Sequence, residues 1–191
     1  MATDTLLYNI DQELATFVAA TTINDGKTTI RTRSGFYNLK DGTAQFGKRP
    51  IIEDSTQTII ADDIQYDKKS GSGLATGTVI YRDTAQGTTI LAGSTEFNSN
   101  TKQVLATKNP VMILKQNNDS IYVAGDTLIS IMIVDTTQAK TDTVQSQGGV
   151  ADTIKGIQVK QASTIDSIRY FQAFHHVRIF SDSLQGVCDS L

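Results

Sequence analysis

Few residues in this chain could take part in catalysis or bind a metal ion, and their spacing suits neither role. His175 and His176 are adjacent, and neighbours on a strand point to opposite faces, so the pair is not expected to converge on one metal ion. The same alternation separates Asp62 from Asp63, which argues against a paired-carboxylate acid–base site. Cys188 is the only cysteine, and no adjacent base activates it, so a small buried apolar role is favoured.

Two further patterns fall short of known binding motifs. The glycines around Ser72 lack the lysine that a phosphate-binding loop requires. Asp119 and Asp126 lie seven residues apart on a strand and face opposite ways, and the chain has no Asp-x-Asp-x-Asp calcium loop. We therefore expect no enzyme, no cofactor and no metal.

Charge and hydropathy narrow the class of protein. The chain has 17 Lys and Arg against 20 Asp and Glu, a net charge of −3 without a basic stripe, so nucleic acid is not an expected partner. Its apolar runs are too short to span a bilayer as helices. The start, MATDTLLYNI, lacks the pattern of a signal peptide. Either the protein is cytoplasmic, or Met1 was added to a mature fragment; the motifs below favour the second.

The backbone that must position any site reads as β-structure. Clusters of turn-forming residues, such as NLKDG and RDTAQG, recur about every fifteen residues. Between them lie apolar runs such as LATGTVIYR, without a sustained helical period. The pattern predicts a meander of antiparallel strands, each of about ten residues and on the order of 33 Å long.

The sequence also repeats itself. Pro50 and Pro110, the only prolines, are 60 residues apart, and KRPII matches KNPVM. Since proline cannot donate to a strand ladder, each is expected at a strand edge, start or bulge. DSIYVAGDTL at 119–128 returns as DSLQGVCDSL at 182–191, where the chain stops as a strand should begin. We expect stacked β units and a fragment of a longer protein.

Composition divides the chain into three parts. Residues 1–134 carry the β pattern, whereas 135–165 are polar, poor in aromatics and expected to form a long loop or insertion. Residues 166–191 resume the strand pattern and are expected to be truncated at the C-terminus.

The phrases ADDIQYD, ATGTVIYRD, LAGSTEF and AFHHVRIFSDSLQG resemble the OstA-like family in its Bacteroidetes-type form. This family includes LptA-like periplasmic lipopolysaccharide-transport proteins and the LptD-like N-terminal domain. A degenerate copy of the motif places His175 where its first copy has Gly77. The motif itself is carried by Ala61, Asp62, Ile64, Tyr66, Asp67, Ala75, Gly77, Val79 and Tyr81, and its copy by Ala173, Val177 and Ile179.

The resemblance implies an all-β fold, a half-open twisted β-jellyroll made by folding over an antiparallel sheet. It implies a non-enzymatic periplasmic carrier whose apolar groove holds the lipid A acyl chains of lipopolysaccharide. Other Lpt-type β-jellyroll domains would join it through edge strands, and a head-to-tail homo-oligomer is a further expectation. The location would be periplasmic, after removal of a signal peptide, with outer-membrane association left open.

The expected lipid-facing wall consists of apolar residues on the long strands. The candidates are Ile64, Tyr66, Val79, Tyr81, Ile90, Val111, Ile113, Ile121, Val123, Ile129, Ile131, Val177 and Ile179. A closed, packed core would need the same residues, so the pattern alone leaves a purely structural β-repeat, such as a scaffold or adhesin segment, as the alternative. A carbohydrate-binding β-sandwich is disfavoured, because the chain has no tryptophan for stacking.

Overall fold

The computed structural model describes residues 1–24, 26–116, 119–134 and 167–191, and in these ranges the regular elements are all β-strands. No helix among them is long and apolar enough to cross a membrane. The strands are β1 (Ala2–Thr3), β2 (Leu6–Asn9), β3 (Leu14–Phe17), β4 (Thr21–Asn24), β5 (Thr28–Thr32), β6 (Ser34–Asn38), β7 (Thr43–Gly47), β8 (Ile51–Asp54), β9 (Gln57–Ile60), β10 (Asp63–Asp67), β11 (Ser72–Asp83), β12 (Thr88–Asn98), β13 (Gln103–Thr107), β14 (Val111–Gln116), β15 (Asp119–Ala124), β16 (Thr127–Val134), β17 (Ser167–Phe180) and β18 (Gln185–Ser190).

Antiparallel pairing sorts these strands into two layers, which face each other. Layer A runs β1-β4-β5-β8-β9, then through one half of β11 and of β12 to β14, β15, the end of β17 and β18. Layer B runs β2-β3-β6-β7-β10, then through the other halves of β11 and β12 to β13, β16 and the start of β17. The expected all-β, folded-over antiparallel sheet is confirmed.

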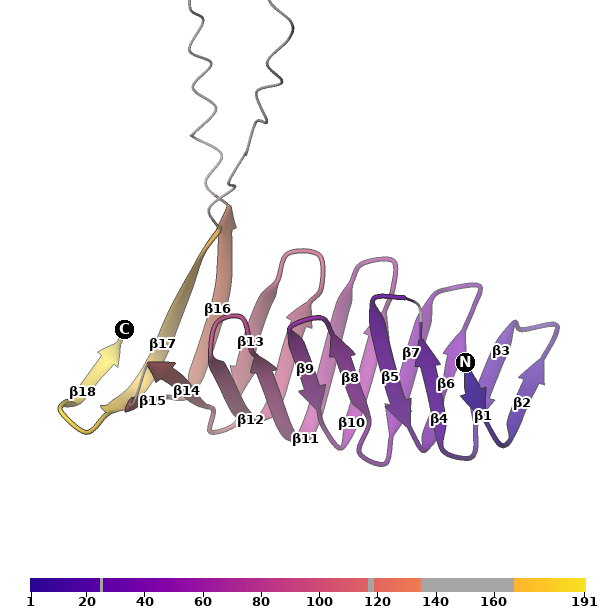
Figure 1. The fold of residues 1–191 in the computed structure, drawn as a ribbon, viewed down its shortest axis with the longest axis horizontal. Coiled ribbons are helices and arrows are strands. Elements are labelled where there is room, and N and C mark those ends of the chain that lie inside the picture. The colour runs from indigo at the N-terminus through magenta and orange to yellow at the C-terminus, as the bar shows by residue number, and fades with distance from the viewer. Residues whose placement is uncertain (25, 117–118, 135–166) are drawn as a thin grey trace, which may run out of the picture.

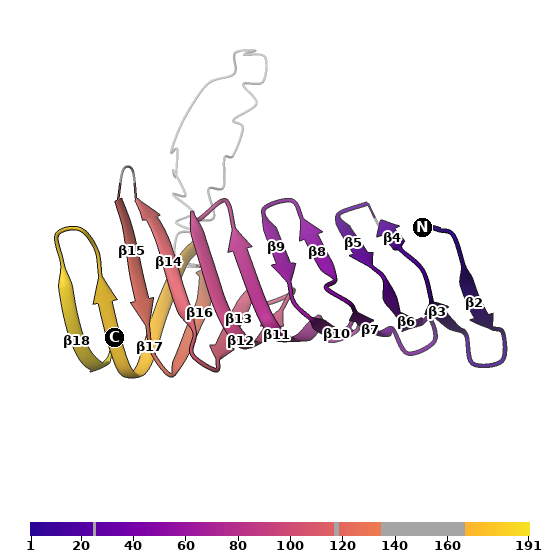
Figure 2. The same cartoon turned by 90° about the horizontal axis from the view of Figure 1, so that it is seen from below.

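The strands stack along the long axis of the molecule, with β2 toward one end and β18 toward the other (Figure 1). The turned view in Figure 2 separates β5, β8 and β9 of layer A from β6, β7 and β10 of layer B. On one long side the chain bends from layer to layer at corners, and the hairpin turns of both layers lie on the other long side. We call this second side the mouth.

The corners explain why most strands are shorter than expected. Each run of about ten residues is interrupted at a corner, so strands of four to six residues are usual and only β11, β12 and β17 pass through. The pairing register shifts between Thr76 and Val79 in β11 and between Phe174 and Val177 in β17. A bulge of this kind sharpens the local bend, which lets a single strand serve both layers.

Left-handed backbone makes the corners tight. Lys48 and Arg49 both have positive φ just before Pro50, and Lys108 and Asn109 repeat this before Pro110. Each proline is buried and immediately precedes a strand, β8 or β14. The fixed φ of proline suits a strand start, and its missing N–H costs no ladder hydrogen bond there.

Asp62 holds together the corner in the middle of the sheet. Its carboxylate accepts hydrogen bonds from the Thr78 amide at 2.9 Å and from Arg49 Nη1 at 2.9 Å, and Arg49 also donates to the Thr78 carbonyl. The Thr78 amide, with Arg49, lowers the pKa of Asp62 below 3.8. The corner is thus tied by one carboxylate that joins three segments of chain.

The core fills the space between the layers. Its main cluster draws Ile59, Tyr81 and Ile90 from layer A, and Ile64 and Val104 from layer B. A smaller cluster near the N-terminus contains Ala15, Phe17, Ala44 and Phe46. Burial of these facing apolar surfaces, at about 25 cal/mol per Å², is what keeps the two layers together.

The expected polar insertion at 135–165 lies outside the described residues. Val134 and Ser167, on either side of it, are register partners on β16 and β17. The proposed division of the chain at these points therefore stays a prediction.

We expect Gly77→Ala to destabilise the protein more than Gly26→Ala. Both glycines have φ near +94°, but a Cβ on Gly77 would clash with the Asp62 carboxylate, whereas one on Gly26 meets nothing within 4 Å. The left-handed conformation alone should cost about 1–2 kcal/mol at either site. The clash should add about 1–3 kcal/mol at Gly77. Urea unfolding measures both; equal losses would mean that Asp62 moves aside without cost.

Candidate functional site

The residues considered for chemistry do not gather into one place. His176 Nδ1 lies 2.9 Å from Asp126, and His175 Nδ1 lies 3.6 Å from Asp189, all with well-exposed side chains. Both histidines have positive φ at the β17 corner, so simple strand alternation was the wrong reason for their separation. Among the described residues, no group of three or more His, Cys, Asp or Glu could hold a metal ion.

Most of the apolar candidates line the space between the layers. Those fully buried in the main cluster are Ile64, Val79, Tyr81, Ile90, Val123 and Val177. Ile121 and Ile179 pack against that cluster while partly buried, and Tyr66 lines a hollow beside it. These side chains come from both layers, so the interior is a trough with two apolar walls.

Four candidates point the other way. Val111 and Ile113 alternate along β14 with Met112, which belongs to the main cluster, and with Leu114, which packs against it. Ile129 and Ile131 alternate along β16 with the buried Leu128 and Ser130. These four therefore lie on the outer faces of the sheet. Both strands are apolar at every position in these stretches except Ser130, so the period-two pattern could not indicate which face is inside.

Several lining residues were missed by the sequence reasoning. Ile59, Phe97, Val104, Met112 and Leu128 all belong to the core cluster or pack against it. Strand pairing marks Phe97 and Val104 as neighbours, because they are register partners on β12 and β13. On the other side of Phe97, its register partner Gly73 leaves room for the ring, which a Cβ there would meet. This information lies in the pairing of strands and cannot be read along one strand.

A hollow of about 120 Å³ lies inside the trough. Ile30, Ile52 and Ile59 of layer A line one side, and Tyr66 and Phe97 of layer B line the other. The two aromatic rings stack with an interplanar angle of 10° and centroids 6.4 Å apart. The rim toward the mouth is polar and consists of Asp54, Gln57, Lys68, Asn98, Ser99, Lys102 and Gln103.

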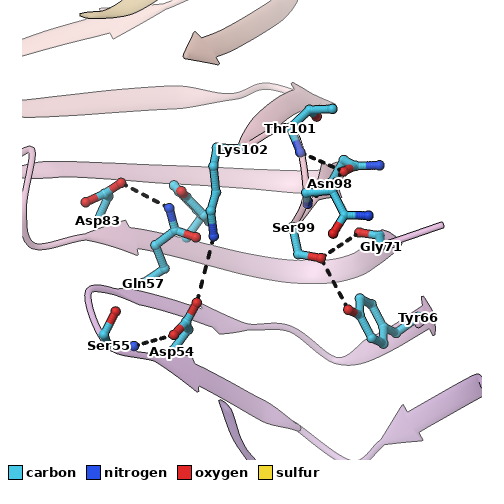
Figure 3. A network of polar contacts seen from close by, with 12 residues as sticks. Asp54, Ser55, Gln57, Tyr66, Gly71, Asp83, Asn98, Ser99, Thr101 and Lys102 are labelled. Carbon is cyan, nitrogen blue, oxygen red and sulfur yellow. Dashed lines mark hydrogen bonds and ion pairs between the residues drawn. The ribbon is translucent and has the colours of Figure 1, made fainter. Parts of the chain in front are cut away.

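A polar contact crosses this rim between the layers (Figure 3). Lys102, in the turn before β13 of layer B, lies 3.9 Å from Asp54 at the end of β8 of layer A. Within layer B, the Tyr66 hydroxyl is 3.3 Å from Ser99 Oγ. The hollow thus has an apolar floor and a polar rim, which is the arrangement an amphiphilic molecule requires.

Tyr81 forms the boundary between the hollow and a buried polar cluster. Its ring lines the hollow, while its hydroxyl accepts a hydrogen bond of 3.5 Å from Arg169 Nη1. Burial raises the pKa of Tyr81 above 10.0, and the nearby Arg169 acts in the opposite direction. Arg169 also contacts Asp83 and Ser130, so charge reaches the wall of an otherwise apolar trough.

A larger concavity of about 700 Å³ lies along layer B. Its outward-facing row runs in register through Phe36, Gln45, Gln65, Leu74, Glu96 and Leu105. Amides and a carboxylate interrupt the apolar side chains of this row, so it has no continuous apolar surface. The trough, with two apolar walls, is the better candidate site.

Comparison with known proteins gives a likeness in structure but none in sequence. No family model matches the chain, and no curated protein matches it. The structure is similar to the crystal structure of LptH from Pseudomonas aeruginosa, described as the LptA homologous periplasmic component of the conserved lipopolysaccharide transport device. The two are 13% identical with a TM-score of 0.47, covering 68% of this chain and 95% of LptH.

Tyr81 should make the protein sensitive to alkali. Because its pKa is raised in the folded state, the stability it contributes is present below pH 10.0 and is lost as pH rises through the folded-state value. Urea midpoints measured across this range should fall more steeply for the wild type than for Tyr81→Phe. Parallel curves would show that the hydroxyl remains accessible to solvent.

Proposed function

We propose that this chain is a non-enzymatic module for lipopolysaccharide transport, which carries lipid A acyl chains in the trough between its two layers. The observation that carries the proposal is the two-walled apolar trough, joined by corners on one side only, with a hollow and a polar rim toward the mouth. The ligand class comes from the OstA-like phrases of the sequence, and with it a periplasmic location.

The physical chemistry of the trough supports this ligand. Each methylene group that leaves water for an apolar wall contributes about 0.8 kcal/mol, so an acyl chain needs no specific hydrogen bond to be held. Lys68 and Lys102 lie at the rim, where the anionic head group of a lipid would meet solvent. Transport of this kind makes and breaks no covalent bond, so the proposal assigns no catalytic residue.

The ends of the sheet support the proposed partners. Among the described strands, β1, β2 and β18 each pair with a single neighbour, and β17 pairs along its first residues only with β16. Each layer therefore ends in an unpaired strand edge at both ends of the stack. Such edges can add a strand from another chain, and partners of the same fold would extend the trough from one domain to the next.

One observation favours the alternative of a β scaffold without a lipid ligand. The hollow, at about 120 Å³, is smaller than the roughly 300–1,000 Å³ of ligand pockets. An acyl chain can enter only if the layers move apart, whereas a scaffold would remain closed.

The exposed Tyr122 and Phe180 rings on the outer face are tilted by 52°, so they do not form a flat platform for a sugar ring.

Photo-crosslinking distinguishes carrier from scaffold. We expect p-benzoylphenylalanine at Phe97, inside the trough, to crosslink to lipopolysaccharide acyl chains. The same residue at Tyr122, an exposed aromatic position on the outer face, is the matched control and should crosslink weakly. Mass spectrometry of the adduct identifies the lipid part that reacts. Equal yields at both positions, or none at Phe97 with bound lipid present, would contradict the proposal.

Edge pairing can be tested with a single added charge. Sedimentation velocity of the wild type should show association that increases with concentration. Leu7→Lys on the edge strand β2 should weaken it, because a lysine on an edge strand opposes strand addition. Leu91→Lys adds the same charge to an exposed position in the middle of layer A and should leave association unchanged. If both variants behave alike, the contact is not made through this edge.

A further inference from the structure

A buried ion pair joins the two layers at the mouth. Asp83 lies at the end of β11 in layer A, and Arg169 lies near the start of β17 in layer B. Arg169 Nη2 is 3.2 Å from Asp83 Oδ2, and the two side chains are only 2% and 3% exposed. Arg169 also reaches Tyr81 in layer A and Ser130 in layer B, so its guanidinium spans the gap between the walls.

The carboxylate of Asp83 accepts several hydrogen bonds apart from its contact with Arg169. Its Oδ1 accepts hydrogen bonds from the amides of Ala85 and Gln86 in the following turn, at 3.1 and 3.2 Å. Its Oδ2 accepts one from Gln57 Nε2 at 3.3 Å, a contact drawn in Figure 3. All three donors belong to layer A, so the carboxylate keeps its partners if layer B moves away.

Arg169 is held much less well. Among the described residues neither its Nε nor its Nη2 makes a hydrogen bond, so the 3.2 Å contact between Nη2 and Asp83 is an ion pair without hydrogen-bond alignment. Its Nη1 contacts are long, at 3.3 and 3.5 Å. A buried ion pair offsets its desolvation only when its geometry is good and its remaining protons are satisfied. On the arginine side this pair leaves protons unsatisfied, so it holds the layers together less firmly than a fully hydrogen-bonded pair would, and it can open if Arg169 moves into solvent.

A second ion pair across the mouth also joins a cation of layer B to a carboxylate of layer A. Lys102 of layer B lies 3.9 Å from Asp54 of layer A, and both residues border the hollow. The other ion pairs found in the described ranges join neighbours within layer A, as in Arg31–Glu53, or lie at corners and the C-terminal edge. The two pairs that cross the mouth are thus set beside the hollow, whose lining also includes Gln57 and Tyr81.

We propose that Asp83–Arg169, assisted by Asp54–Lys102, is a latch across the mouth, closed in the empty protein and opened when an acyl chain enters. The inference rests on the proposed function for its ligand, but the mechanical part stands on the two layers alone. Opening transfers Arg169 toward solvent and the entering chain, while Asp83 stays bound to its own turn. The latch also explains how a trough with so small a hollow could accept a lipid.

The mechanical part is tested without lipid. Spin labels on cysteines at Gln86 and Thr101, exposed in turns of layers A and B, report the separation across the mouth in a Cys188→Ala background. Arg169→Met keeps the apolar stem of the side chain and removes the guanidinium group, and with it the ion pair. It should widen the measured distance distribution. Arg31→Met, which removes the Arg31–Glu53 pair within layer A, is the matched control and should not. An unchanged distribution in Arg169→Met overturns the latch.

Measuring the rate of lipid uptake distinguishes failure of the latch from failure of the proposed function. Stopped-flow binding of a fluorescent lipopolysaccharide should be roughly tenfold faster for Arg169→Met, and faster to a smaller degree for Lys102→Met, than for the wild type or Arg31→Met. Lys102 is part-exposed, so its variant is expected to fold normally. Binding with equal rates in all four proteins would leave the carrier function standing and reject the latch. A wider mouth without any lipid binding would retain the latch and reject the carrier function.

Discussion

The structure depends on one backbone constraint, which is that the chain must turn from one layer to the other within about two residues at every corner. L-residues rarely adopt positive φ, yet pairs such as Lys48-Arg49 and His175-His176 do so. The conformational strain is local and recurs at the corners, whereas burial of both inner faces stabilises the fold along the whole stack. Without the corners the same strands would form one wide, flat sheet with an exposed apolar face.

This constraint also accounts for the shape of the interior. Because the corners close one side, the layers are joined covalently there. At the mouth, the contacts found between the described residues of the two layers are made by side chains. Apolar residues near the corners, including Ala61, Ala75 and Val177, are almost wholly buried, while polar and charged groups collect toward the turns. A trough closed by backbone on one side and by side-chain contacts on the other follows from the way the sheet folds.

The same architecture leaves strand edges at both ends of the stack, where a closed barrel would have none. Unpaired edges normally promote aggregation, and the short β1 and β2 limit the length that is exposed. In a carrier the edges have a use, since strand addition aligns the interior of one domain with that of the next. In the proposed carrier, mouth and edges are then separate features, one for ligand entry and one for assembly.

The sequence by itself determined the all-β class, the regular spacing of the turns and the equivalent positions of Pro50 and Pro110, because turn chemistry and period-two alternation are local properties. It also indicated Gly77 and His175 as matching positions, and both lie at strand corners with positive φ. Tertiary structure alone decided which face of β14 and β16 is inside, since runs such as VMIL are apolar on both faces. It alone brought Asp83 to Arg169, because a contact between residues 86 positions apart depends on how the layers fold over, which no local pattern encodes.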